Sequence, residues 1–245
     1  MNRLRLRMRD LALAAVLPIM VVVMVVVMAG GGAWAQCPLP SASARDPTVH
    51  LVILEPRLIY RHDLDLVGLA SVRDTFERAP GSGVILGLTK RNDELRIRVR
   101  SILQPSVDGR TCIWVDEVTA RIGDPEMDVY VAANYQPGSC EYNVVLEHEN
   151  RHVAINRNVV AAFGPRIGAQ LRAAVRRMFP MITTNPKDAA RLPQILIDAV
   201  RPVLTAMEAE LRRENGAIDT PESYRQAHGR CRNWFPAGTR MPARR

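Results

Sequence analysis

The chain has 245 residues, of which 47% are hydrophobic and 24% are charged, close to the usage of ordinary globular proteins. This composition excludes a disordered polymer, a collagen-like repeat and a protein with several membrane spans. The length and the net charge of +8 are compatible with one or two globular domains.

Residues 1–35 follow the plan of a secretory signal peptide. Four arginines precede an apolar run over residues 11–28, and the segment ends in Ala33-Trp34-Ala35, with small residues at the two positions that a signal peptidase reads. The run is also long enough for an uncleaved membrane anchor, but Pro18 and the A-x-A ending favour cleavage. We therefore expect a periplasmic or secreted protein that touches a membrane only if the signal stays uncleaved.

The remaining residues, 36–245, are expected to form a single domain whose first part, 36–139, is mainly β. Five apolar stretches have the length and composition of strands, and they cover residues 49–60, 84–88, 95–99, 112–122 and 127–132. Short polar connections between them predict a largely antiparallel sheet of about five strands. A helix is expected within residues 64–78.

The second part, residues 140–245, is expected to be mainly α. The predicted helices cover residues 141–178 with an interruption at Gly164-Pro165, then 189–214, then about 221–230. Asn215-Gly216 is a typical end for the second helix, and Thr220-Pro221 is a typical start for the short third helix. Strands followed by helices indicate an α+β fold.

Four cysteines lie in the part of the chain that we expect to be exported, at Cys37, Cys112, Cys140 and Cys231. An oxidising compartment favours two disulfides. Because no C-x-x-C pair occurs, a cysteine zinc site has no support. Among the three possible pairings we favour Cys140 with Cys231, which would tie the start of the first long helix to the C-terminal segment, and the sequence leaves the other pairings open.

The first long helix contains His148-Glu149-Asn150-Arg151-His152, an H-E-x-x-H motif. Residues four apart on a helix lie one turn above each other, so both imidazoles can reach one Zn²⁺ ion while Glu149 is offset toward a bound water. Zinc lowers the pKa of that water, and a neighbouring carboxylate can take its proton as the water attacks a carbonyl. The alternative is a pair of structural histidines, hydrogen-bonded in the core without a metal.

This motif, on a helix that follows a sheet, resembles that of the zincin metallopeptidases. With its signal peptide, its return helix and a later Asp-bearing segment, the chain also resembles bacterial families of secreted zinc-dependent proteases of unknown function. The resemblance implies that His148 and His152 are zinc ligands and that Glu149 is the general base. Zincins usually carry uncharged residues between Glu149 and His152, whereas this chain has Arg151, which leaves open a role in substrate recognition or a lost activity.

A catalytic zinc ion usually has three protein ligands and a water, so a third ligand is needed. If the two long helices form an antiparallel pair with a turn near residue 183, position 150 lies opposite about 216. The candidates near that level are Glu210, Glu214 and Asp219, with Glu222 and His228 further along. We favour Asp219, which matches the Asp-bearing segment of the similar families; Glu214 would give the glutamate-zincin arrangement.

Tyr224 is the expected hydrogen-bond donor to a developing oxyanion, with His228 as the alternative. The expected function is therefore an exported zinc metallopeptidase, a hydrolase whose substrate is a peptide, a protein or a cell-envelope polymer with peptide-like amides. A non-catalytic metal-binding or envelope-interaction protein that retains the H-E-x-x-H helix is the alternative. Export, and the lack of a basic array interleaved with aromatic residues, argue against a nucleic-acid partner.

Overall fold

The computed structural model describes residues 37–38, 40, 46–76, 84–235 and 239. Contacts divide the chain into two compact units, residues 1–31 and residues 32–245, and the description below concerns the second. The signal peptide predicted for residues 1–35 lies outside the described residues.

The described strands form two mixed sheets. They are β1 (Thr48–Leu54), β2 (Arg57–Arg61), β3 (Gly87–Arg91), β4 (Glu94–Pro105), β5 (Thr111–Gly123), β6 (Glu126–Val131) and β7 (Met181–Thr183). One sheet has the order β1-β5-β4, with β7 also paired to β5, and the other has the order β2-β6-β3. The β1–β5 and β2–β6 pairs are parallel, and the other pairs are antiparallel. The α+β class is confirmed, but the prediction of a single sheet of five strands is wrong.

Two strand interruptions that lie opposite each other divide the strands between two sheets. The stretch predicted as one strand over residues 49–60 is interrupted at Glu55-Pro56, because proline has no N–H to donate to a ladder. The partner strand is interrupted after Gly123, whose φ of 123° suits glycine. The β1–β5 pair therefore ends at Leu54 and Gly123, and the parallel pairing resumes in β2 and β6.

The first long helix, α3 (Cys140–Met178), is continuous, so the interruption predicted at Gly164-Pro165 is wrong. The Ser139 side chain caps its start by accepting a hydrogen bond from the N–H of Tyr142. Gly164 lets the helix approach β1, since a Cβ there would lie 2.6 Å from Ile53 Cδ1. Buried residues on both sides of Pro165, Phe163 and Ile167 among them, stabilise the helix by packing and offset the cost of an internal proline.

The remaining helices follow the predicted order, except that the 3-10 helix is not predicted and the return helix both starts and ends a few residues later than predicted. They are α2 (Leu66–Phe76), the 3-10 helix η2 (Pro186–Arg191), α4 (Leu192–Ile218) and α5 (Pro221–Gly229). The return helix α4 extends four residues beyond its predicted end at Glu214, and the N–H of Asp219 still donates to the Asn215 carbonyl at 3.1 Å. Thr220 caps α5 as predicted, accepting a hydrogen bond from the N–H of Ser223.

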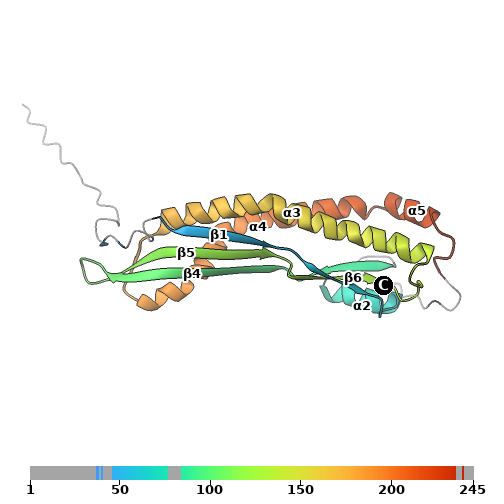
Figure 1. Cartoon of the computed structure of the whole chain (residues 1–245), viewed down its shortest axis with the longest axis horizontal. Coiled ribbons are helices and arrows are strands. Elements are labelled where there is room, and N and C mark those ends of the chain that lie inside the picture. Colours follow the sequence, from blue (N-terminus) through green and yellow to red (C-terminus); the bar gives the residue numbers. More distant parts are fainter. Residues whose placement is uncertain (1–36, 39, 41–45, 77–83, 236–238, 240–245) are drawn as a thin grey trace, which may run out of the picture. The chain divides into compact units, whose positions relative to one another are not determined.

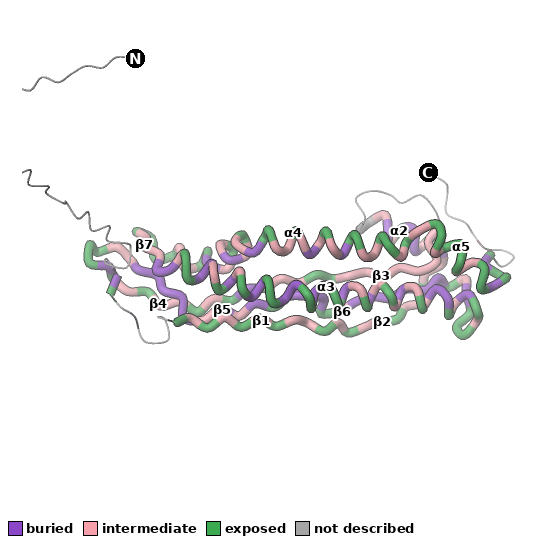
Figure 2. The backbone as a smooth tube through the Cα atoms, turned by 90° about the horizontal axis from the view of Figure 1, so that it is seen from above, coloured by how far each residue is buried: buried purple, intermediate pink, exposed green. Residues whose placement is uncertain are grey.

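Helices α3 and α4 lie side by side along the strands (Figures 1 and 2). The largest core cluster joins them to the sheet of β1, β4 and β5, through residues such as Val115, Leu171 and Leu196, which are almost fully buried. A second cluster contains the start of α3, Tyr135 and the C-terminal Trp234. The turn region between α3 and α4 therefore lies over the β1-β5-β4 sheet. The start of α3 and the end of α4 lie near the β2-β6-β3 sheet.

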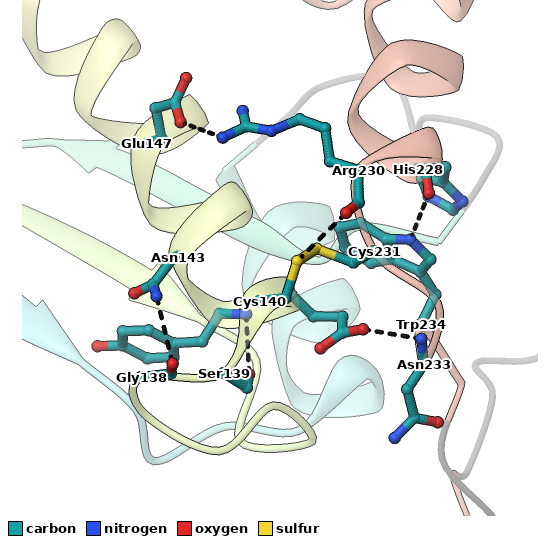
Figure 3. Close-up of a disulfide and its surroundings, with 12 residues drawn as sticks. Gly138, Ser139, Cys140, Asn143, Glu147, His228, Arg230, Cys231, Asn233 and Trp234 are labelled. Atoms are coloured by element: carbon teal, nitrogen blue, oxygen red, sulfur yellow. Dashed lines mark hydrogen bonds and ion pairs between the residues drawn. A yellow bond between two sulfur atoms is a disulfide. The ribbon is translucent and has the colours of Figure 1, made fainter.

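The four cysteines form two disulfides, Cys37–Cys112 and Cys140–Cys231. The favoured pairing of Cys140 with Cys231 is thus confirmed, and it ties the first turn of α3 to the segment after α5 (Figure 3). Two disulfides are compatible with an exported protein. Among the helices of the described residues, none combines the length and the apolar character that a membrane span needs.

The junction between the two sheets contains a buried carboxylate, Asp124, which is 1% exposed. Neither of its carboxylate oxygens has a hydrogen-bond partner among the described residues. Burial and repulsion from Asp93 raise the pKa of Asp124 to about 7, against the opposing charge of Arg91. Below that pH the side chain is largely neutral in the folded protein.

We expect Asp124→Asn to change how stability depends on pH. An acid whose pKa is higher in the folded chain stabilises the fold while protonated, and this stability is lost as pH rises from about 4 toward about 7. In the variant this side chain is neutral at every pH. The Tm of Asp124→Asn minus the Tm of wild type should therefore be larger at pH 8 than at pH 5. Thermal unfolding followed by circular dichroism measures this; exposed Asp46→Asn is the control, and equal differences for Asp124→Asn at both pH values would contradict the expectation.

Candidate metal centre

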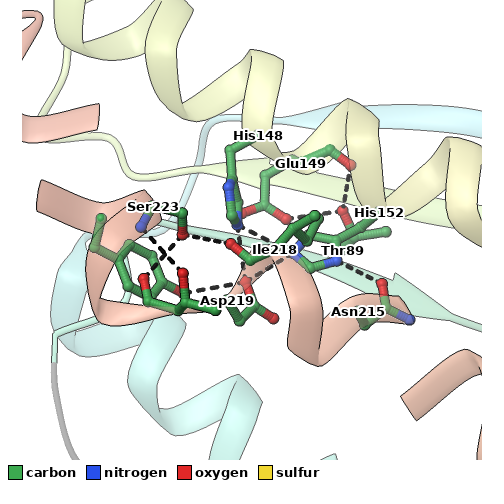
Figure 4. A network of polar contacts seen from close by, with 10 residues as sticks. Thr89, His148, Glu149, His152, Asn215, Ile218, Asp219 and Ser223 are labelled. Carbon is green, nitrogen blue, oxygen red and sulfur yellow. Dashed lines mark hydrogen bonds and ion pairs between the residues drawn. The ribbon is translucent and has the colours of Figure 1, made fainter. Parts of the chain in front are cut away.

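Three side chains, two from the N-terminal part of α3 and one from the C-cap of α4, converge near the start of α5 (Figure 4). His148 and His152 come from successive turns of α3, and Asp219 is the residue that ends α4. The Asp219 Oδ1 atom lies 3.0 Å from His148 Nε2 and 3.2 Å from His152 Nε2. The two Nε2 atoms are 3.1 Å apart. These three form the one group of metal-binding type among the described residues.

The pairing of α3 with α4 brings Asp219 to this position. His148 contacts Asp219, and one turn further His152 contacts Asn215. These contacts place the turn between the helices near residue 183, and they confirm the register predicted from an antiparallel pair. Four-residue spacing on each helix therefore brings two side chains of α3 opposite two side chains of α4.

Asn215 fixes the orientation of the His152 ring. Its Nδ2 donates a hydrogen bond to the Leu211 carbonyl at 2.8 Å, so its Oδ1 faces His152 Nδ1, 2.6 Å away. An amide oxygen accepts, so the hydrogen-bond network assigns a proton to Nδ1 of His152. In the neutral ring, Nε2 then carries a lone pair that points at the other two members of the group.

Glu149 lies beside the group and is 4% exposed. The Thr89 hydroxyl lies 2.8 Å from Glu149 Oε2 and 3.1 Å from the Glu149 backbone carbonyl, and so fixes the side chain against β3. Burial raises the pKa of the Glu149 carboxyl, against the opposing effects of His152, Thr89 and His148. A carboxylate with a raised pKa is a better proton acceptor once it is ionised.

Gly87, the first residue of β3, gives Glu149 the room it needs. A Cβ at this position would lie 2.6 Å from Val145 Cγ1 and 2.7 Å from Glu149 Oε1. We expect Gly87→Ala to destabilise the fold by about 1–3 kcal/mol through overpacking, measured as a lower Tm. Gly216→Ala is the matched control: a Cβ there meets nothing within 4 Å, and a helical alanine should raise Tm. An unchanged Tm for Gly87→Ala would contradict the close packing.

The electrostatics of the group favour a positive charge at its centre. Burial acts to raise the pKa of Asp219, but its hydrogen bonds with His148 and His152 outweigh burial and hold that pKa well below its usual range. Burial acts to lower the pKa of His152, but Asp219 and Glu149 raise it above its usual value. A proton or a metal ion between the three side chains would satisfy the same preference.

Tyr224, the expected oxyanion donor, lies at the edge of the group. Its hydroxyl donates to Asp219 Oδ1 at 3.2 Å, and its ring centroid lies 5.7 Å from that of His148. Ser223 bonds back to the end of α4, through its hydroxyl and the Ile218 carbonyl at 2.5 Å. The turn between α4 and α5 therefore orients both Asp219 and Tyr224.

The other candidates for a third ligand lie outside the group. Glu210 and Glu214 pair with Arg213, and Glu222 pairs with Arg225. His228 stacks on Trp234, with ring centroids 4.6 Å apart. Arg151 is exposed and lies in a shallow depression on another face of α3, with Glu147 and Asn150, so it does not enter the group.

Two residues of the site were not predicted from sequence. Thr89 is sixty residues from Glu149 along the chain, and no local pattern distinguishes it from another strand threonine. The sequence pattern indicates only a helix end at Asn215, although its spacing of four residues from Asp219 matches that of His148 and His152. That equal spacing is the signal that could have found it.

No family model, curated protein or solved structure matches this chain. The likeness to zincins therefore rests on the H-E-x-x-H residues, and the function has to be argued from the geometry of the site.

Proposed function

We propose that this protein is a zinc-dependent hydrolase that cleaves amide bonds of a peptide or protein substrate. His148, His152 and Asp219 would hold the metal, and Glu149 would act as the general base. The observation that carries the proposal is the triangle formed by His148 Nε2, His152 Nε2 and Asp219 Oδ1, with sides of 3.0, 3.1 and 3.2 Å.

The residues present fit a zinc ion. Zinc in catalytic sites takes three nitrogen or oxygen ligands at about 2.0–2.2 Å in a tetrahedral arrangement, which puts the ligand atoms roughly 3.3–3.6 Å apart. The observed separations of 3.0–3.2 Å are close to that requirement. Two imidazoles and one carboxylate are also a ligand set of catalytic zinc sites, which keep a further position for water.

The chemistry divides between the metal and the residues around it. Bound zinc would lower the pKa of a water molecule and polarise a carbonyl. Glu149, oriented by Thr89, would take the proton of the attacking water on a carboxylate oxygen and later return it to the leaving amine. Tyr224 would donate a hydrogen bond to the developing oxyanion.

Metal content and hydrolysis test the proposal together. Purified protein reconstituted with zinc and freed of loosely bound metal should contain about one zinc per chain, and a value below about 0.2 would exclude the metal centre. The same protein should hydrolyse casein or members of a peptide library. A protein that binds zinc but hydrolyses none of these substrates would favour a non-catalytic metal-binding or envelope-interaction role.

Asn215→Ala is expected to weaken zinc binding by about 10–100-fold, because the residue that orients a ligand histidine contributes to metal affinity. Competition with a chromogenic chelator measures the affinity. Asn215→Asp retains an oxygen acceptor toward His152 Nδ1, so it should keep most of the affinity. If alanine and aspartate bind zinc equally well, the hydrogen bond to His152 does not support the metal centre.

A further inference from the structure

A recess opens beside the metal centre, on the side of α5. Its lining is mainly apolar and includes Leu86, Val145, Ala227 and Trp234, and His148 and Glu149 form the wall toward the metal centre. The cavity volume of the recess is about 50 Å³, which is room for one small group. An apolar group held here would lie directly beside the proposed reacting residues.

Helix α5 forms the outer wall of this recess through Tyr224 and Ala227. None of the residues of α5 is buried, and Tyr224 is 45% exposed. Ala227 is half-buried against the second core cluster and His228 stacks on Trp234, but a short helix with no fully buried side chain gains limited stability from packing. The position of α5 therefore depends largely on what holds its two ends.

The start of α5 is attached through the end of α4, and its far end is fixed to the start of α3 (Figure 3). Cys231 is disulfide-bonded to Cys140. The N–H of Asn233 donates to a Glu141 carboxylate oxygen at 2.7 Å, and the Tyr135 hydroxyl donates to the Trp234 carbonyl at 2.9 Å. The disulfide is the covalent member of this anchor.

We propose that the recess binds an apolar side chain of the substrate, and that the Cys140–Cys231 disulfide keeps α5 in place as its wall. The substrate part of this inference rests on the proposed hydrolase function. Apart from the wall of His148 and Glu149 and the polar atoms of Tyr224 and His228, the lining is apolar. A charged side chain would therefore lose most of its water there, so the recess favours an uncharged apolar side chain. The metal ligands do not depend on the disulfide, since His148 and His152 belong to α3 and Asp219 ends α4.

Binding is tested in the full chain carrying Glu149→Gln, so that turnover does not interfere. The probe is N-acetyl-leucine amide, compared with N-acetyl-glycine amide and N-acetyl-lysine amide. The reporter is the NMR signal of the Trp234 indole N–H, which donates to the His228 carbonyl at 2.8 Å and is assigned with Trp234→Phe. The leucine amide should shift this signal to saturation, and the other two amides should not. Equal shifts by all three amides would overturn the apolar recess.

The role of the disulfide is tested in the same chain with Cys37→Ala and Cys112→Ala added, which leaves Cys140–Cys231 as the single disulfide. This variant should bind the leucine amide as the parent does. A water-soluble trialkylphosphine, which chelates zinc far less than a dithiol does, is added to the folded protein. The phosphine supplies two electrons and becomes the phosphine oxide with the oxygen of water, whose two protons convert Cys140 and Cys231 to thiols. Affinity for the leucine amide should then fall at least about tenfold, while circular dichroism and zinc content stay unchanged. Unchanged affinity after reduction would overturn the role of the disulfide.

Ala227→Trp gives a second variant in which the disulfide is intact and the recess is filled. This variant should no longer bind the leucine amide but should still bind zinc. If it still binds the amide, the amide binds outside the recess.

Failure of this inference is distinct from failure of the proposed function. Saturable leucine amide binding by a chain that holds no zinc contradicts the hydrolase, whereas peptide hydrolysis without apolar preference contradicts the recess alone.

Discussion

Replacing Glu149 by Gln is expected to reduce hydrolysis of casein or peptides by about 10²–10⁴-fold, the usual contribution of a general base. The amide has nearly the same shape and can still accept the Thr89 hydrogen bond, but it cannot take a proton from water. Because Glu149 is not one of the three converging ligands, the variant should keep about one zinc per chain. Initial rates and metal content, measured on the same preparation, check both expectations.

Glu210→Gln is the matched control for this experiment. It makes the same change of charge and shape on α4, where Glu210 pairs with Arg213 away from the metal centre. Activity should stay within about twofold of wild type, as for most surface substitutions. If Glu149→Gln keeps its activity, Glu149 is not the general base. If both variants and wild type are equally inactive, the proposed hydrolase function is wrong.

Removing the carboxylate of Asp219 is expected to have the largest effect on metal binding. Asp219→Ala leaves two imidazoles in place of three ligands, so zinc affinity should fall by more than about 100-fold, beyond the loss expected for a residue that only orients a ligand. A bound ion stabilises the folded state by mass action, about 4 kcal/mol at a thousand times its Kd. Zinc at a thousand times the wild-type Kd should therefore raise the Tm of wild type, and it should raise the Tm of Asp219→Ala by no more than about a third as much.

Glu214→Ala separates Asp219 from the alternative third ligand. Glu214 lies one turn before Ile218 and pairs with Arg213, so its removal should leave the zinc-dependent rise in Tm intact. If the Glu214 variant loses the response to zinc and the Asp219 variant keeps it, the arrangement of ligands differs from the one proposed. Thermal shift assays with and without zinc decide between the two.

Much of the candidate site could be predicted from the sequence, because its ligands follow from helix periodicity. The spacing of His148 and His152 places both imidazoles on one face of a helix. The level of Asp219 follows from the length of two antiparallel helices, and the contacts of His152 with Asn215 confirm that register. Because α3 is continuous across Gly164-Pro165, counting residues along it locates the level of Asp219 more accurately than counting along a broken helix would.

The sheet was predicted less well, because hydrophobic alternation reports which residues form strands but not which strands pair. The break at Glu55-Pro56 and the positive φ of Gly123 divide the predicted sheet in two. One consequence is that β3 lies under the motif helix. Thr89 and Gly87 reach Glu149 through that placement, which depends on contacts between residues about sixty positions apart in the chain.

The sequence by itself determined the α+β class and the helix that carries the H-E-x-x-H residues, and it favoured the Cys140–Cys231 pairing that the structure confirms. These depend on local periodicity, on residue spacing and on the small number of ways in which four cysteines can pair. The tertiary structure alone decided how Asn215 orients His152, how Thr89 orients Glu149 and how α5 closes the recess beside them. Each of these contacts joins separate elements, and the free energy that sets it comes from packing of the whole domain, which no single segment of the sequence encodes.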